Sequence, residues 1–286
     1  MTFPSTPQEA AREKALKHPF KAVAFDVDGT LTHFARFTIP TFMAEALVKI
    51  PENIPRAICT GRDLRFIHRQ LLHICSHSLN PDEELKRWWV FAENGGVGYR
   101  WNTHKKDFEP WYEVDWPEHP SKDTLEAFGK DKLGWSGIFL LREHSMIVRH
   151  PDWTYLFPKL TRILSKHSHR KLDKILGKNG WTETFMVQDS GIGNVILPRA
   201  SGKGSAMQRW AKQLGLNPKD ILVVGDQPRP GENDESFLCG DNGTAFSVGS
   251  LIHATFPLPV RDERGRRLKG PEGTAKLLEQ VRWDQN

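Results

Sequence analysis

Four short apolar runs mark the chain, and each ends at, or is directly followed by, a polar or charged residue. The runs are AVAF (22–25), RAICT (56–60), WWVFAE (88–93) and ILVVGD (221–226). Apolar runs of this length, without polar alternation, are typical of strands buried on both faces of a parallel sheet. Apolar residues at helical spacing occupy other stretches, at 40–50, 63–75 and 204–216. The alternation of strand and helix therefore predicts an α/β fold with a doubly wound, Rossmann-like parallel sheet.

A middle segment interrupts this pattern. It contains short alternating runs such as GIFLLREHSMIVRH (137–150), which are typical of an antiparallel hairpin, and a helical stretch at 157–176. We therefore expect a core built from residues 1–96 and 197–286, with a smaller α/β unit, a cap, inserted at 97–196.

The residues that follow the predicted strands share one kind of chemistry. Asp26 and Asp28 follow the first strand, Thr60 ends the second, and Asp226 follows the last. Because ligands of open α/β sheets bind at the carboxyl ends of the strands, we expect these side chains to converge. Crowded carboxylates repel each other unless a cation or a shared proton lies between them.

Three further residues extend the group. Lys203 lies between glycines in ASGKGSAM, where a helix is predicted to begin, and a lysine there supplies a point charge for phosphate. Asn233 and Asp234, in GENDESFL, add oxygen donors. Taken singly, each residue has an ordinary alternative as a strand end, a helix cap or a surface lysine. Their order after apolar strands indicates phosphate chemistry.

These motifs resemble those of the haloacid dehalogenase superfamily of phosphohydrolases. The matching stretches are DVDGT (26–30), ICTGR (58–62), SGKG (201–204) and VVGDQPRPGENDESFL (223–238). Together with FAENGGVGY (91–99), GENDESFL is similar to the branch with a large α/β cap, the Cof-type or subclass IIB branch. That branch includes sugar phosphatases and eukaryotic-type phosphomannomutases.

The resemblance implies a mechanism and a set of site residues. Asp26 would be the nucleophile that forms an aspartyl-phosphate, and Asp28 would protonate the leaving oxygen and then activate water. The implied Mg²⁺ ligands are Asp26, the backbone carbonyl of Asp28, Asp226, and Asn233 or Asp234. The implied phosphate-binding residues are Thr60, Gly61 and Lys203.

The resemblance assigns the choice of substrate mainly to the cap. The candidate substrate-binding residues are Arg62, Asn94, Arg142, His144 and Arg149. For the residues of the hairpin at 137–150, a solvated surface role is an equal alternative. The implied function is a Mg²⁺-dependent phosphatase acting on a small sugar phosphate or phosphorylated polyol. The alternative is a phosphomannomutase-like hexose phosphomutase, which needs several arginines to grip a second phosphate.

Net charge and hydropathy limit which partners the protein is expected to bind and where in the cell it is expected to be. The formal net charge is +5 with scattered basic residues, which favours a small anionic metabolite over nucleic acid. No run approaches the roughly twenty apolar residues of a membrane span, and the polar N-terminus does not resemble a signal peptide. Three cysteines without metal spacing favour a reduced, intracellular protein. Together with the missing apolar span, this predicts a cytoplasmic protein with no membrane partner.

Overall fold

The computed structural model describes residues 7–33, 36–191 and 193–285 and divides the chain into two compact units. The first unit runs to Tyr112 and resumes over Lys203–Arg229 and from Asp234 onward. The second unit comprises Glu113–Gly202 together with Pro230–Asn233.

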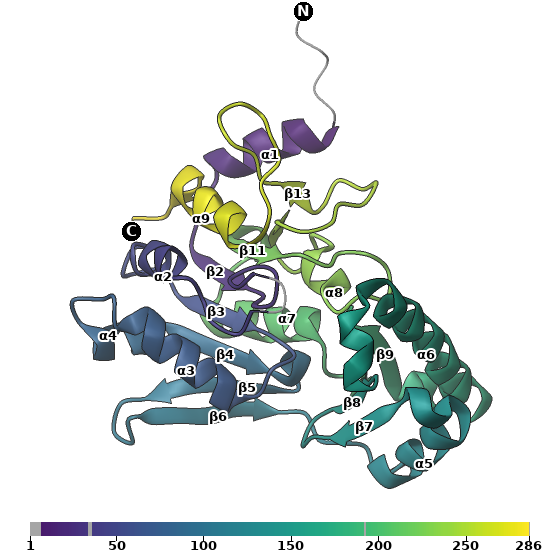
Figure 1. Ribbon diagram of the computed structural model, residues 1–286. Helices are drawn as coiled ribbons and strands as arrows, with labels where there is room; N and C mark the ends of the chain where they lie inside the picture. The colour runs from purple at the N-terminus through teal and green to yellow at the C-terminus, as the bar shows by residue number, and fades with distance from the viewer. Residues whose placement is uncertain (1–6, 34–35, 192, 286) are drawn as a thin grey trace, which may run out of the picture. The chain divides into compact units, whose positions relative to one another are not determined.

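The first unit is built on an eight-stranded sheet with the order β13-β12-β11-β2-β3-β4-β5-β6 (Figure 1). Its strands are β2 (Ala22–Phe25), β3 (Arg56–Cys59), β4 (Trp88–Ala92), β5 (Val97–Asn102), β6 (Asp107–Glu113), β11 (Ile221–Gly225), β12 (Thr244–Ser247) and β13 (Leu258–Pro259). The pairs from β13 to β4 are all parallel, and β5 is antiparallel to β4. Strands β1 (Pro19–Phe20) and β14 (Arg282–Trp283) form a separate parallel pair.

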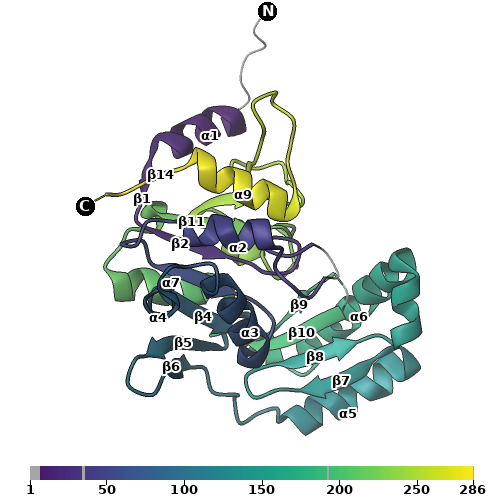
Figure 2. The same cartoon turned by 60° about the vertical axis from the view of Figure 1, so that its left-hand side comes forward.

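Helices cover both faces of this sheet, as Figure 2 shows for α2, α3 and α9 on one side and α7 on the other. The helices of the first unit are α1 (Pro7–Lys17), α2 (Thr41–Val48), α3 (Leu64–Cys75), α4 (Pro81–Lys86), η1 (Glu93–Gly95), α7 (Lys203–Leu214), η5 (Pro218–Asp220), α8 (Glu235–Leu238) and α9 (Gly270–Gln280). Val23 and Phe25 of β2 pack with α2, α3 and α9, whereas Ala22 and Ala24 pack with α7 and α8. Because successive residues of a strand point to opposite faces, all four positions must be apolar. The predicted doubly wound α/β fold is confirmed.

The second unit is a four-stranded antiparallel sheet with the order β7-β8-β10-β9. Its elements are α5 (Lys122–Leu133), η2 (Gly134–Ser136), β7 (Ile138–Leu141), β8 (Met146–Arg149), η3 (Asp152–Leu156), α6 (Pro158–Lys178), η4 (Trp181–Glu183), β9 (Phe185–Asp189) and β10 (Gly193–Pro198). Leu125 of α5 and Leu172 of α6 share one apolar core with Phe139 and Met146 of the sheet. The hairpin and the long helix expected in this segment are therefore both present.

The boundaries between the units differ from those expected from the sequence. Strand β5 pairs with β4 and extends the first sheet, so residues 97–112 lie in the first unit and not in the cap. The chain turns back there through the left-handed backbone of Asn94 and Gly95, with φ of 54° and 79°. At the other end, β10 continues to Pro198 beside β9, so residues 197–202 lie in the second unit.

None of the helices in the described part of the chain is both long and apolar enough to cross a bilayer.

Candidate active site

Three carboxylates meet at the carboxyl ends of two neighbouring strands. Asp26 follows β2 and Asp226 follows β11, and these strands pair in parallel with Val224 opposite Phe25. The backbone N–H of Asp26 donates to the carbonyl of Val224 at 2.9 Å, which fixes the two strand ends side by side. Asp234 stands directly before α8, and one carboxylate oxygen from each of the three acids lies within 4.8 Å of the others. The structure thus brings together three of the acids singled out from the sequence.

Lys203 supplies the positive charge of this cluster. Its Nζ lies 2.5 Å from Oδ1 of Asp26 and 2.5 Å from Oδ1 of Asp234. Lys203 and Asp234 have no exposed surface, and Asp26 is 4% exposed. The second oxygen of Asp234 accepts the backbone N–H groups of Asp226 (3.1 Å) and Gln227 (3.2 Å). Asp234 therefore fixes the lysine and also the backbone that carries Asp226.

Burial and neighbouring charges have opposing effects on the pKa values of Asp26 and Lys203. Burial raises the pKa of Asp26 to about 7, Lys203 opposes the rise, and the carboxylates of Asp234 and Asp28 add to it. Burial alone would lower the pKa of Lys203, but Asp234 and Asp26 more than offset this and raise it. The lysine is therefore a permanent ammonium ion, while the proton on Asp26 is labile near neutral pH.

Asp28 is held by an arginine and not by the lysine. Arg62 donates from Nε to Oδ2 of Asp28 (3.0 Å) and from Nη2 to Oδ1 (2.8 Å), a bidentate ion pair. This hydrogen bonding raises the pKa of Arg62. The rings of Phe66 and Phe37 flank the guanidinium at 4.8 and 5.2 Å. The sequence did not predict this pairing. It assigned Arg62 to substrate contact, and Phe66 fits the apolar spacing of a packed helix.

The loop after β3 brings Thr60, Gly61 and Asn94 together. The buried Thr60 hydroxyl oxygen accepts the N–H of Arg62 at 3.2 Å, and the N–H of Asn94 donates to the carbonyl of Thr60 at 2.8 Å. A Cβ placed on Gly61 would lie 3.2 Å from Oδ1 of Asn94. That Oδ1 is buried and accepts no hydrogen bond from the described residues. Two sequence candidates in separate motifs therefore lie beside each other.

The donor set around Asp226 fits a magnesium ion. The converging ligand atoms of Asp26, Asp226 and Asp234 are all carboxylate oxygens, the ligands that Mg²⁺ prefers. The backbone is closely fitted to them, because a Cβ on Gly29 (φ 83°) would lie 2.6 Å from Oδ2 of Asp226. A Cβ on Gly225 would lie 2.9 Å from Oδ2 of Asp234. The sequence predicts a turn at Gly29, but not the close approach of either glycine to a carboxylate.

Asn233, the other expected metal ligand, belongs to the second unit. Its backbone N–H donates to the carbonyl of Asp189 at 3.1 Å, and Gly231 in the same loop accepts from the N–H of Asp189 at 2.7 Å. The side-chain Oδ1 of Asn233 is buried and accepts no hydrogen bond from a described residue.

The hairpin candidates also lie in the second unit, and two of them precede β8 in a turn. The strands end at Leu141 and restart at Met146, so Arg142 and His144 lie in the connecting turn. His144 is 5% exposed, and its Nδ1 lies 3.1 Å from the carbonyl of Val114, to which it donates. Arg149 ends β8 and pairs with an exposed carboxylate, that of Asp152, at 2.5 Å.

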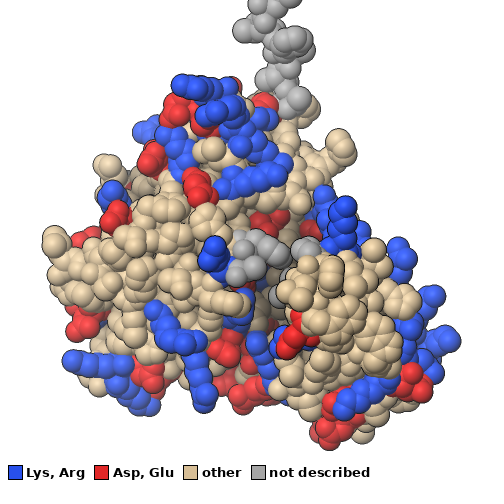
Figure 3. All heavy atoms as spheres, in the orientation of Figure 1, with Lys and Arg blue, Asp and Glu red and all other residues tan. Residues whose placement is uncertain are grey.

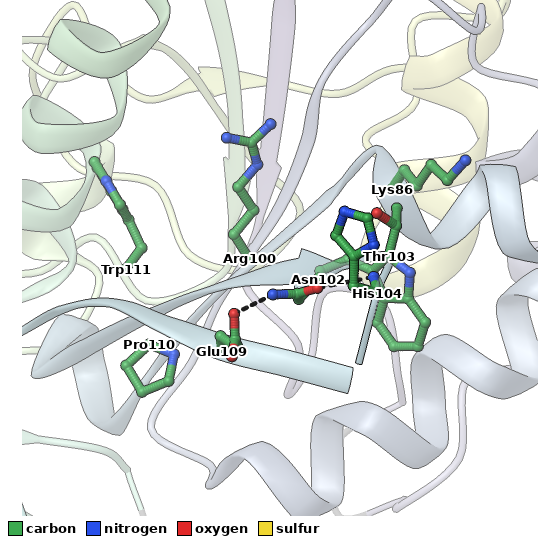
Figure 4. Close-up of a pocket in the computed structure, with 9 residues that line it drawn as sticks. Lys86, Arg100, Asn102, Thr103, His104, Glu109, Pro110 and Trp111 are labelled. Atoms are coloured by element: carbon green, nitrogen blue, oxygen red, sulfur yellow. Dashed lines mark hydrogen bonds between the residues drawn. The ribbon is translucent and has the colours of Figure 1, made fainter. Parts of the chain in front are cut away.

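A separate hollow of about 450 Å³ lies on the β5–β6 hairpin (Figure 4). Arg100 and Trp111 border one part of it, and Asn102 bonds to Glu109 across the hairpin. None of the residues that line it is one of the site residues described above. The chemistry at the strand ends therefore does not use this hollow.

Known proteins resemble this chain along most of its length. The family model described as sucrose-6F-phosphate phosphohydrolase matches residues 165–250, a range that contains Lys203, Asp226 and Asp234. A phosphoglycolate phosphatase of Picrophilus torridus is 26% identical over 234 residues, which cover 81% of this chain and 77% of the relative. A phosphoglycolate phosphatase of Methanobrevibacter smithii is 22% identical over 233 residues, with 80% and 86% coverage.

Solved structures share the fold at low identity. An IMP-bound mutant of Plasmodium falciparum IMP-nucleotidase has a TM-score of 0.67 at 14% identity, covering 98% of this chain and 72% of that one. The sucrose-phosphatase of Synechocystis, in complex with sucrose and phosphate, has a TM-score of 0.53 at 18% identity, with 80% and 83% coverage. These likenesses establish a shared fold.

Proposed function

Because this chain belongs to the haloacid dehalogenase superfamily and is a phosphoric monoester hydrolase, we propose that it hydrolyses a small sugar phosphate with Mg²⁺, through a phosphorylated Asp26. The observation that carries the proposal is the fully buried ammonium of Lys203, held 2.5 Å from both Asp26 and Asp234. An interior cation beside a strand-end carboxylate offsets the charge of a nucleophile that must meet an anionic phosphoryl group.

In the first step, a carboxylate oxygen of Asp26 attacks phosphorus, and the bond from phosphorus to the leaving oxygen breaks. Asp28 gives its proton to that oxygen. Thr60, Gly61 and Lys203 would hold the phosphoryl oxygens through the hydroxyl, the backbone N–H and the ammonium group.

Asp28 can act as an acid only after Arg62 releases it. The bidentate pair occupies both carboxylate oxygens of Asp28, so neither oxygen is available to the leaving group while the pair is intact. A bound phosphoryl group offers Arg62 a second anion of higher charge, so we expect substrate to draw the guanidinium away from Asp28. In the second step, Asp28 takes a proton from the water that attacks the phosphoryl group on Asp26, which releases phosphate and restores the carboxylate.

The metal would be held by Asp26, Asp226, the backbone carbonyl of Asp28, and Asn233 or Asp234. When bound, Mg²⁺ would supply positive charge that neutralises the phosphoryl oxygens. Asp234 already accepts from Lys203 and from two backbone N–H groups, so Asp226 is the better direct ligand. Asp234 would then act mainly by positioning Lys203.

Two substrate classes have support. The match to a sucrose-phosphate phosphohydrolase family over residues 165–250 favours a sugar phosphate. Three curated relatives named phosphoglycolate phosphatase, each matching 72% or more of this chain, favour phosphoglycolate as the second candidate. Arg62 and Asn94 are the proposed substrate contacts of the first unit, and Arg142 and Arg149 those of the second. His144, being buried against Val114, would support the turn that carries Arg142.

The test is phosphate release from a panel of sugar phosphates and phosphoglycolate, with Mg²⁺ and with a chelator. Asp26→Asn should abolish release, and mass spectrometry of the quenched wild-type reaction should find phosphate on Asp26. Asp82→Asn, the same change at an exposed site on α4, is the matched control and should keep full activity. Release from Asp26→Asn at the wild-type rate would contradict the proposed nucleophile. Conversion of a hexose 1-phosphate into its 6-phosphate, with catalytic bisphosphate present, would assign the mutase reaction instead.

A further inference from the structure

Helix α6 concentrates the positive charge of the protein. It contains seven Lys and Arg residues and one carboxylate, Asp173, so this helix alone has a larger positive surplus than the +5 of the whole chain. Asp173 is itself paired with His169 at 3.1 Å. Figure 3 shows Lys and Arg side chains gathered along the right-hand edge of the second unit, where Figure 1 draws α6. Neither the fold nor the proposed hydrolysis accounts for this concentration.

Six of these cations share the exposed face of the helix. They are Lys159, Arg162, Lys166, Arg170, Lys174 and Lys178. From Arg162 onward they recur at every fourth residue, which places them along one side of the helix, while Leu172 and Leu176 bury the opposite side. None of the six forms an ion pair with a residue in the described ranges 7–33, 36–191 and 193–285. A row of closely spaced cations without ion-pair partners favours the binding of a partner that carries several negative charges.

Exposed apolar side chains lie within and beside this row of cations. Ile163, 65% exposed, stands among the first three cations, and Leu156 and Phe157 are 77% and 56% exposed just before the helix begins. Trp153 lies in η3, which contacts α6, and stacks on Trp135 with ring centroids 6.1 Å apart; the two rings are 51% and 68% exposed. Exposed apolar side chains that are grouped in this way mark an interaction site with a protein or a membrane.

We propose that this basic–apolar face, formed by the six cations of α6 with Leu156, Phe157 and Ile163 and the Trp135–Trp153 pair, binds the surface of a bilayer that contains anionic phospholipids. Lys and Arg complement the negative headgroups, and apolar side chains enter the boundary between headgroups and acyl chains. Leu156 and Ile163 are aliphatic and suit hydrocarbon, and the rings of Phe157, Trp135 and Trp153 suit the headgroup boundary. Because such rings also stack on nucleobases, the test includes an oligonucleotide. The contact is peripheral and requires no spanning helix.

The test is co-sedimentation of the full chain with large unilamellar vesicles. We expect binding to phosphatidylcholine vesicles that carry about 30% phosphatidylserine, little binding to phosphatidylcholine alone, and weaker binding as salt is raised. The triple variant Arg162→Glu, Lys166→Glu, Arg170→Glu should lower the partition coefficient about tenfold or more. Circular dichroism and hydrolysis of p-nitrophenyl phosphate, both unchanged, would show that the variant is folded.

The matched control reverses three exposed cations of the first unit, with Lys17→Glu, Lys212→Glu and Arg264→Glu. It changes the net charge by the same amount and should keep vesicle binding within about twofold. A second variant, Leu156→Ser with Ile163→Ser, should weaken vesicle binding without affecting retention on a single-stranded oligonucleotide.

Three results would overturn the proposal. The first is equal or absent binding to both kinds of vesicle. The second is an equal loss in the α6 variant and in the control, which would reduce the effect to net charge. The third is oligonucleotide binding stronger than vesicle binding and lost in the α6 triple variant, which would assign the face to nucleic acid.

Discussion

Replacing Lys203 with methionine removes the only charge that neutralises two interior carboxylates in the described structure. Asp26 and Asp234 are both at most 4% exposed, and each receives a 2.5 Å hydrogen bond from the ammonium group. Breaking a buried ion pair by deleting one partner costs about 3–5 kcal/mol, because the remaining charge is uncompensated. We therefore expect Lys203→Met to lower the free energy of unfolding by about 3–5 kcal/mol at pH 8 in the absence of metal.

The size of this loss should depend on pH. The folded-state pKa of Asp26, about 7, lies above its ordinary value of 3.8, so Asp26 favours folding at low pH and loses that contribution as pH rises through 7. Without Lys203 the pKa of Asp26 rises further, so the contribution of Asp26 to folding stability is lost over a wider pH range. Between pH 7 and 8 only the variant continues to lose stability, so its deficit should be about 1 kcal/mol smaller at pH 6 than at pH 8.

Guanidinium unfolding, followed by tryptophan fluorescence and circular dichroism at both pH values with a chelator present, measures the effect. Lys212→Met, an exposed lysine on the same helix, is the matched control and should change stability by no more than about 0.5 kcal/mol. Adding Asp26→Asn to Lys203→Met should recover part of the loss, because one of the two uncompensated charges is gone. A loss equal to that of the control, or one that grows as pH falls, would refute this account of the site.

Three further outcomes follow from the same geometry. Because the pKa of Asp26 is raised to about 7, Mg²⁺ must displace a proton, so calorimetric titration should find binding up to about tenfold tighter at pH 8 than at pH 6; equal affinities would contradict this. Gly29→Ala places a Cβ 2.6 Å from Oδ2 of Asp226 at φ 83°, and should weaken Mg²⁺ binding and lower the free energy of unfolding by about 1–3 kcal/mol. Gly180→Ala, at φ 72° with nothing within 4 Å, is its control and should cost stability but leave metal affinity unchanged. Arg62→Lys keeps the charge but loses the bidentate geometry, and should lower kcat/KM about 10- to 100-fold without unfolding the protein; wild-type kinetics would show that the arginine is dispensable.

The central strands were predictable because local sequence determines them. AVAF at 22–25 forms β2 at the predicted residues, since a central strand buried on both faces is built mostly from apolar residues. The hairpin at 97–112 was assigned to the wrong unit because its alternating aromatic and polar residues fit the edge of any antiparallel sheet. Only its pairing with β4, which depends on the backbone at Asn94 and Gly95, decides which sheet it joins. Strand β12 has only two apolar residues, Ala245 and Phe246, between Thr244 and Ser247, and β13 has only two residues, so neither has enough pattern to be identified from sequence.

The candidate site was predictable for the same reason. Residues that directly follow central parallel strands, such as Asp26 and Asp226, must emerge at one edge of the sheet. Side chains with several reachable partners were less predictable. Arg62 could have faced substrate, solvent or Asp28, and the choice depends on the two phenylalanine rings that flank its guanidinium. Long side chains are positioned by tertiary packing, which a single sequence does not encode in any local pattern.

The route of the chain has an evolutionary consequence. Between Tyr112 and Lys203 the polypeptide leaves the first unit and returns, and it re-enters at the very residue whose ammonium group neutralises the acids. A recombination that exchanged residues 113–202 would replace most of the second unit while leaving Asp26, Asp226 and Asp234 unaltered. Such an exchange succeeds only where the incoming segment rejoins in frame at the glycine-flanked lysine, and where the short loop 230–233 finds an equivalent strand to bind.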